Sequence, residues 1–354
     1  MKKQIVVITL GIASLAAAPA FAQSSSVTLY GILDIGLNHT SNKDGSNLNE
    51  LRSGNAFSSR FGFRGREDLG SGLSAMFNLE SGLSLDTGAA SSTFWNRQSW
   101  VGVAMQGVGQ VTAGLQLPTI SDVFVLSASA AYFGNQGAAL DGAAAAAGST
   151  AARFNNMIGG IRSVNAIKFN SADFAGFKLG AMTALGEGAA TNGRTDSVGL
   201  SYGFSQFEAG VAYHRTNCAG GSSCAAGTGD DKITGIGAAY KFGQGGRIGA
   251  FMTREKNAKN VLGNDADVMS LMAVVPLSSW TLLAGYQTLN DKSAANQDIK
   301  QLNLGVKYLL SKRTELYSLY SAQRVDNGGR ASMYGELSSD SKQSQFNVGL
   351  RHFF

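Results

Sequence analysis

Hydrophobic and polar residues alternate along most of this chain, in short segments that are separated by turns. In the first segment, Val27, Leu29 and Leu33 fall on one side of an extended chain, whereas Thr28 and Tyr30 fall on the other. Alternation with a period of two is typical of a β-strand with one apolar and one polar face. The repeat predicts sixteen strands, at residues 27–38, 58–68, 73–80, 97–104, 110–116, 163–170, 177–185, 197–204, 207–215, 232–242, 247–255, 267–275, 280–288, 299–310, 314–323 and 345–354.

The stretch 117–161 interrupts this repeat. It is rich in Ala and Gly, it shows no steady alternation, and its only charged residues are Asp122, Asp141 and Arg153. A structureless loop of about 45 residues is uncommon in a compact soluble domain unless the loop has a function. We interpret it as a constriction loop that lies inside a β-barrel and narrows its channel.

The connections between the predicted strands alternate between short turns and longer polar loops. This rhythm is typical of outer-membrane barrels, which have short periplasmic turns and long outer loops. The alternative is a soluble β-sandwich, whose strands show the same alternation. Aromatic residues at the strand ends and polar faces rich in Gly, Ser, Thr and Arg favour a membrane barrel, as does the need of one long sheet to pair its edges.

The first residues have the features of an export signal. Lys2 and Lys3 precede an apolar run at residues 5–18, and the small residues of Ala20-Phe21-Ala22 form a cleavage site. This predicts a cleaved leader at 1–22 and a barrel domain at 23–354. The alternative, an uncleaved anchor, is disfavoured because the apolar run is short and ends in small residues.

Composition narrows the class further. Charged residues make up only 15% of the chain, which is few for a soluble surface of this size. The formal net charge of +5 is spread along the chain, and no basic run indicates nucleic acid. Beyond the leader, no apolar run reaches the roughly 18 residues of a membrane-spanning helix. A membrane location therefore requires a closed barrel, because lipid tolerates no unpaired strand edge.

The two cysteines, Cys218 and Cys224, lie close together in one polar loop. In an exported chain this spacing predicts a local disulfide. A metal site is the alternative, but His214 is the only nearby histidine. No cofactor or metal site is expected.

Three segments carry a resemblance to a known family. They are residues 27–31 (VTLYG), residues 59–70 (SRFGFRGREDLG) and residues 346–354 (FNVGLRHFF). In combination they resemble the Gram-negative trimeric general porins, above all the β-proteobacterial branch, and the likeness extends over the whole chain. In such proteins the final aromatic residue, here Phe354, signals to the barrel-assembly machinery.

The resemblance implies an all-β, 16-stranded antiparallel transmembrane barrel in the cell outer membrane, surrounded by lipid and lipopolysaccharide. It further implies a homotrimer, passive diffusion of small hydrophilic solutes, and a third outer loop folded into the lumen. In the family, basic residues of the wall face acidic residues of that loop. Carried over by position, the wall residues are Arg60, Arg64 and Arg97, with Lys168 or Arg162 as a fourth, and the loop acid is Asp122. The loop departs from the family pattern because residues 137–148 are mostly alanine.

The balance of these charges predicts weak to moderate anion preference. Arg60, Arg64 and Arg66 share one strand face, on which neighbouring positions lie about 7 Å apart, and guanidinium groups stay charged at neutral pH. Glu67, Asp68 and Glu80 are expected to reduce the positive field of these arginines near the turn, and Glu80 is also a candidate residue of the constriction. The alternative is that the arginines are solvated or bind lipopolysaccharide.

Two other functional classes fit the sequence less well. An enzyme needs a positioned base, and no Ser–Asp partner set can be placed beside His39, His214 or His352, so catalysis is not expected. An adhesin or phage receptor would use the outer loops as its binding surface. Conductance distinguishes these classes, because a plugged barrel gives no steady open channel.

Overall fold

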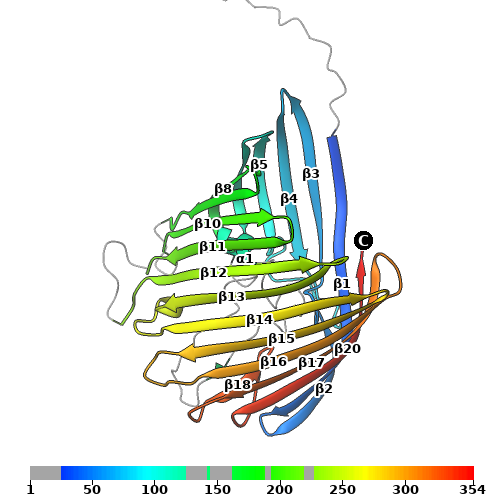
Figure 1. The fold of residues 1–354 in the computed structure, drawn as a ribbon, viewed down its shortest axis with the longest axis vertical. Helices are drawn as coiled ribbons and strands as arrows, with labels where there is room; N and C mark the ends of the chain where they lie inside the picture. Colours follow the sequence, from blue (N-terminus) through cyan, green and yellow to red (C-terminus); the bar gives the residue numbers. More distant parts are fainter. Residues whose placement is uncertain (1–24, 125–141, 144–161, 188–192, 219–226) are drawn as a thin grey trace, which may run out of the picture.

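The computed structural model describes residues 25–124, 142–143, 162–187, 193–218 and 227–354. Within them the chain forms one large antiparallel sheet that closes into a barrel (Figure 1). Its strands are β1 (Ser25–Lys43), β2 (Ser46–Ser53), β3 (Arg60–Gly70), β4 (Leu73–Gly82), β5 (Gln98–Met105), β6 (Gly109–Gln116), β8 (Ser163–Ser171), β9 (Phe177–Ala184), β10 (Thr195–Phe204), β11 (Phe207–Thr216), β12 (Asp231–Phe242), β13 (Gly246–Lys256), β14 (Ala266–Leu277), β15 (Trp280–Asp291), β16 (Ile299–Leu309), β17 (Thr314–Val325) and β20 (Lys342–Phe353). The other elements are helix α1 (Thr119–Phe124), β7 (Gly142–Ala143), the 3-10 helix η2 (Ala258–Asn260), β18 (Arg330–Met333) and β19 (Glu336–Leu337). The predicted leader, residues 1–22, lies outside the described residues.

Strand β1 closes the barrel. One of its edges pairs with β20, with Gly36 opposite Gly349. Its other edge pairs with β3 along residues 25–32 and with β2 along residues 35–43. Because β2 and β3 continue one another along the same edge, they form one interrupted strand, and the seventeen segments of the sheet make sixteen barrel strands. The predicted strand count is confirmed, and the sandwich alternative is wrong because the sheet has no free edge.

The connection between the predicted strands 27–38 and 58–68, expected to be one of the longer polar loops, is mostly strand, so this prediction is wrong. β1 continues to Lys43, and Asp44 and Gly45, with φ of 45° and 90°, turn the chain into β2. In this hairpin Leu37 pairs with Leu51, and both side chains point outward, being 67% and 52% exposed. Toward the tip nearly all residues are polar, Leu48 being the exception, so the period-two signal disappears although the strands continue.

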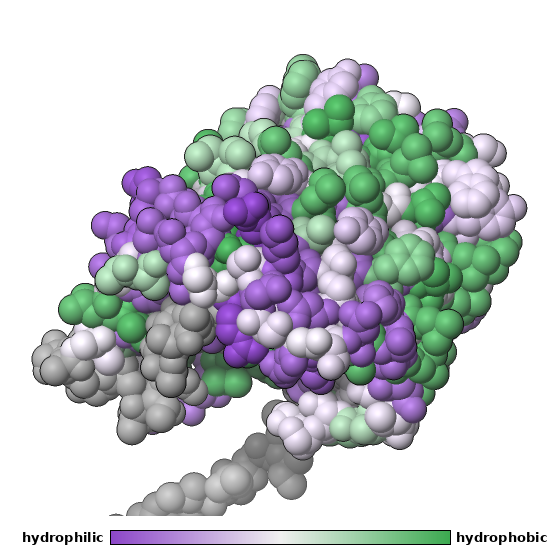
Figure 2. All heavy atoms as spheres, turned by 90° about the horizontal axis from the view of Figure 1, so that it is seen from below, coloured by the Kyte–Doolittle hydropathy of each residue, from purple (hydrophilic) through white to green (hydrophobic). Residues whose placement is uncertain are grey.

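The two faces of the sheet differ in exposure and in chemistry. In β10, the outward Val198 and Leu200 are 45% and 41% exposed, whereas the inward Ser197 is 3% exposed. The same alternation runs through β11 to β17 and β20. Figure 2 shows hydrophobic side chains spread over one broad side of the molecule and hydrophilic ones gathered on an adjoining part. An apolar outer wall around a mainly polar interior is the arrangement of a membrane barrel.

Aromatic rings pair across neighbouring strands beside the short turns, at one end of the barrel. The pairs are Phe177 with Tyr202, Phe207 with Tyr240 and Trp280 with Tyr308, with ring centroids 4.3, 4.9 and 4.6 Å apart. Rings at this level form an interfacial girdle, because an aromatic ring is stable where lipid meets water.

The break between β2 and β3 folds into the barrel. Ala56 is fully buried and Phe57 packs with it against inward side chains of β14, β15 and β17. Asp34 of β1 anchors the segment, since its carboxylate accepts hydrogen bonds from the Phe57 amide (3.0 Å) and the Tyr317 hydroxyl (2.8 Å). The chain itself thus fills part of the interior.

Among the described residues, no helix combines the length and the apolar character needed to cross a membrane.

Candidate functional site

Two arginines form ion pairs with one glutamate at the inner wall, and a third arginine lies beside them. The Arg97 Nε lies 2.6 Å from Glu80 Oε1, and the Arg60 Nη1 lies 3.9 Å from the same oxygen. Arg162 donates from Nε to the Arg97 carbonyl at 2.7 Å. We call these four residues the arginine cluster. Three guanidinium groups against one carboxylate leave an excess of two positive charges.

The sheet register explains why the arginine cluster forms. Arg60 begins β3, and Glu80 of β4 stands opposite Gly62 of that strand. Arg97 immediately precedes β5, and Arg162 immediately precedes β8. Four segments that are distant in sequence therefore meet where their strands start or end.

Burial and neighbouring positive charge affect the pKa of an arginine in the arginine cluster. The side chains of Arg60, Glu80 and Arg97 are 18%, 10% and 13% exposed. Burial lowers the pKa of Arg162, which lies outside the strands, to about 10, and the positive charge of Arg97 contributes to the same shift. The guanidinium of Arg162 is therefore still charged at neutral pH.

A tyrosine connects the arginine cluster to Arg64. The Tyr30 hydroxyl donates to Asn78 Oδ1 at 2.8 Å and lies 3.1 Å from Glu80 Oε2. The Arg64 guanidinium lies over the Tyr30 ring, 5.2 Å from its centroid, within cation–π range. Arg64 is exposed and stands four residues along β3 from Arg60. The basic wall is therefore a ladder along β3 with a compact cluster at one end.

Lys168 and Asp122 form a separate contact at the root of the long loop. Asp122 lies in α1 and forms an ion pair with Lys168 of β8. Lys168 also donates to the Leu117 carbonyl at 3.0 Å, and the Asn170 amide lies 3.4 Å from Asp122 Oδ2. The lysine side chain is 7% exposed and the aspartate side chain 41%.

The predicted site residues thus divide into two groups. Arg60, Arg97 and Arg162 come together, whereas Lys168 pairs with the predicted loop acid. Glu80, also predicted for the constriction, lies with these arginines. Its expected place near the turn after β3 is wrong, because it pairs across β4 and β5 with Gln98, at the far end of those strands from the turn. Of the predicted constriction loop, 117–161, only residues 117–124 and 142–143 are described.

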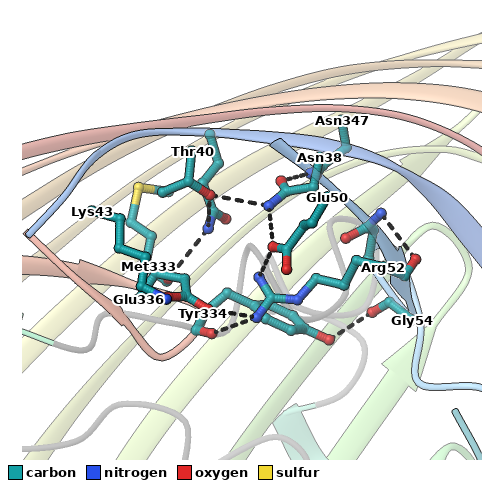
Figure 3. A network of polar contacts seen from close by, with 12 residues as sticks. Asn38, Thr40, Lys43, Glu50, Arg52, Gly54, Met333, Tyr334, Glu336 and Asn347 are labelled. Atoms are coloured by element: carbon teal, nitrogen blue, oxygen red, sulfur yellow. Dashed lines mark hydrogen bonds and ion pairs between the residues drawn. The ribbon is translucent and has the colours of Figure 1, made fainter. Parts of the chain in front are cut away.

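No signal in the sequence indicated the polar contacts made by the last outer loop, residues 326–341. Figure 3 shows Arg52 of β2 pointing toward this loop. The Arg52 Nη2 lies 3.3 Å from both the Tyr334 carbonyl and Glu336 Oε1, and its guanidinium lies 4.1 Å from the Tyr334 ring centroid. Lys43 of β1 forms a second ion pair with Glu336 at 2.9 Å (Figure 3). Around Arg52 the sequence offers only Leu51 between two charged residues, which is too short a pattern to define a strand.

The last outer loop lies against the inner wall. Gln323 and Gln343, inward residues of β17 and β20, accept hydrogen bonds from the amides of Ser332 and Met333 at 2.8 and 2.7 Å. Strand β18 of this loop also pairs with β7 of the long loop, joining residues 330–331 to residues 142–143. The two loops therefore meet inside the barrel.

The remaining predicted positions are only partly described. Cys218 is buried and disulfide-bonded, and Cys224 lies outside the described residues. Phe354 exchanges backbone hydrogen bonds with Gly31, and its ring covers the space above that glycine. In the described part of the chain, no three His, Cys, Asp or Glu side chains are placed to hold a metal ion.

A closed barrel with an apolar outer wall and charged groups on its inner wall defines a membrane channel of the β-barrel class. The sequence pattern of the family described as "Gram-negative porin" matches residues 9–329. The chain therefore belongs to the Gram-negative porins and is an outer-membrane protein. Membership in a family of channels agrees with the expectation that the chain is not an enzyme.

Individual relatives agree with this assignment. Outer membrane porin protein 32 of Delftia acidovorans is 31% identical over 376 residues, which cover 100% of both chains. An outer membrane porin protein of Bordetella pertussis is 25% identical, and the match covers 95% of this chain and 96% of the relative. The solved structure of an anion-selective porin from Comamonas acidovorans has a TM-score of 0.76 and 26% identity, covering 94% of this chain and 100% of its own.

Proposed function

We propose that this porin is a passive channel for ions and small hydrophilic solutes, with a weak to moderate preference for anions. The observation that carries the proposal is the excess positive charge of the arginine cluster on the inner wall. A pore selects by its diameter and by the charges that line it. Fixed positive charge raises the local concentration of anions and lowers that of cations.

Further observations support the sign of this preference. Arg64 and Arg66 extend the positive charge along the same face of β3. The pairing of Asp122 with Lys168 offsets the one predicted loop acid, so that acid does not counter the arginine cluster. A solved porin of similar sequence, that from Comamonas acidovorans, is described as anion-selective.

The proposal also covers the narrowing of the lumen by the long loop and the assembly of the protein in the membrane. Helix α1 packs on the inner face of the barrel, and β7 pairs with the last outer loop, which supports a long loop, 117–161, that narrows the lumen. We further propose a homotrimer embedded in lipid and lipopolysaccharide, delivered by the barrel-assembly machinery through Phe354, and export with cleavage of residues 1–22.

The function is tested with the purified full-length protein in planar bilayers. The expected result is stable single-channel conductance steps, and a reversal potential in a salt gradient whose sign indicates anion preference. Clear cation preference would overturn the proposed selectivity, and the absence of steady channels would overturn the channel function itself. The oligomer is measured independently, by light scattering in detergent.

A further inference from the structure

Three glycines lie side by side on the inner wall beneath α1. Gly180 of β9 stands directly opposite Gly199 of β10, and Gly210 of β11 lies on the next strand. A Cβ atom added at these positions would lie 2.5 Å from Thr119 Cγ2, 2.6 Å from Val123 Cγ2 and 2.4 Å from Val123 Cγ1, respectively. Helix α1 therefore occupies the space that three inward side chains would otherwise fill.

Other contacts hold α1 in the same place. Ile120 is fully buried in an apolar cluster with Ala212, Ile233 and Phe251 of the inner wall, and Val123 packs against that cluster. The Ile120 amide donates to Ser197 Oγ at 3.1 Å, which satisfies one of the free N–H groups at the start of the helix. The glycines and the apolar cluster together define a fitted position for the helix on β9 to β11.

This position determines where Asp122 lies. With Thr119 and Val123 over the glycines, the neighbouring residue Asp122 reaches β8, where it meets Lys168 and Asn170. A shift of the helix by the width of a methyl group would move the Asp122 carboxylate relative to Lys168. The packing of α1 on the three glycines and the ion pair of Asp122 with Lys168 are thus linked through one short helix.

We propose that Gly180, Gly199 and Gly210 form a seat that positions the root of the long loop in the lumen and keeps Asp122 on Lys168. They are positioning residues for conduction. The inference rests on the proposed function, because it assumes that the loop narrows a conducting pore. It adds that the width of the pore depends on glycines of the wall as well as on the loop itself.

The test is a double-mutant cycle at Gly210 and Val123, measured as single-channel conductance and open-channel current noise in planar bilayers. A Cβ at Gly210 would meet Val123 Cγ1 at 2.4 Å, whereas its next nearest atom, the Leu200 carbonyl oxygen, is 3.4 Å away. Gly210→Ala therefore introduces one clash, and Val123→Ala removes it. Gly203→Ala on β10 is the matched control, because the nearest atom to its Cβ would be Glu208 Cγ at 4.0 Å.

We expect Gly210→Ala to raise both conductance and current noise, and Gly203→Ala to leave them at the wild-type value. The double variant Gly210→Ala/Val123→Ala should return toward the wild type, which a general loss of barrel stability would not produce. Folding of each variant is checked by its heat-dependent electrophoretic mobility. If folded Gly210→Ala conducts like the wild type, or if Val123→Ala gives no rescue, the seat is refuted.

The sign of the reversal potential separates this inference from the proposed function. Asp122 and Lys168 carry opposite charges, so releasing both leaves the net charge of the lumen unchanged. The seat variants should therefore keep the ion preference of the wild type while their conductance changes. Failure of the anion preference in the wild type would refute the proposed function and leave the seat to be judged by conductance alone.

Discussion

The ion preference of this porin should respond in opposite directions to two substitutions in the arginine cluster. Arg97→Gln removes one positive charge and leaves Glu80 in contact with Arg60 and Tyr30. Glu80→Gln removes the one negative charge and keeps an oxygen that accepts from Arg97. The first should weaken anion preference and the second should strengthen it.

The size of the effect follows from Coulomb's law. A unit charge acts on an ion about 7 Å away in water with about 0.6 kcal/mol, and screening at about 0.1 M salt reduces this to about 0.3 kcal/mol. Because anions and cations respond with opposite sign, the difference between them is about 0.6 kcal/mol. This corresponds to a change of about threefold in the anion-to-cation permeability ratio.

The assay is the reversal potential of single channels in a salt gradient. Arg254→Gln is the control, because Arg254 points outward on β13, is 67% exposed and has an ion pair of similar length, 2.7 Å, with Asp267. It should leave the ratio unchanged. The role of the arginine cluster in ion preference is refuted if Arg97→Gln and Glu80→Gln shift the ratio in the same direction, or if Arg254→Gln shifts it as much as either.

Three other predictions concern the architecture. Arg52→Ala should increase current fluctuations, because Tyr334 and Glu336 of the last outer loop lose their contacts with Arg52 at 3.3 Å; single-channel noise measures this, and Arg254→Gln again serves as the control. Gly31→Val should reduce the yield of folded barrel in refolding experiments, since a Cβ at Gly31 would lie 2.3 Å from the Phe354 ring; wild-type yield would contradict the contact. Reduction of the disulfide of Cys218 should lower the unfolding temperature and leave conductance unchanged, as the residue lies beyond the end of β11.

The strands were predictable because the outer wall and the interior impose alternation wherever the sheet crosses the membrane. The predicted edges of β5, β6 and β8 lie within one residue of those observed. The signal failed in β2, where most residues of both faces are polar. It also missed β18 and β19, whose contacts are with the interior of the barrel and with another loop.

The candidate site was predictable in its composition but not in its geometry. The resemblance supplied Arg60, Arg97 and Arg162, yet their meeting around Glu80 depends on the register between strands, which the sequence pattern does not specify. The glycine seat beneath α1 could not be predicted from the sequence, for a different reason. A glycine in a strand has many possible uses, and only the packing of Val123 over Gly210 reveals this one.

The most direct test of the proposed anion preference compares the wild type with the triple variant Arg60→Gln/Arg97→Gln/Arg162→Gln in one salt gradient. We expect an anion-preferring reversal potential for the wild type and a loss of that preference in the variant, with the channel still open. A wild type that prefers cations, or a folded triple variant that keeps the full anion preference, would contradict it.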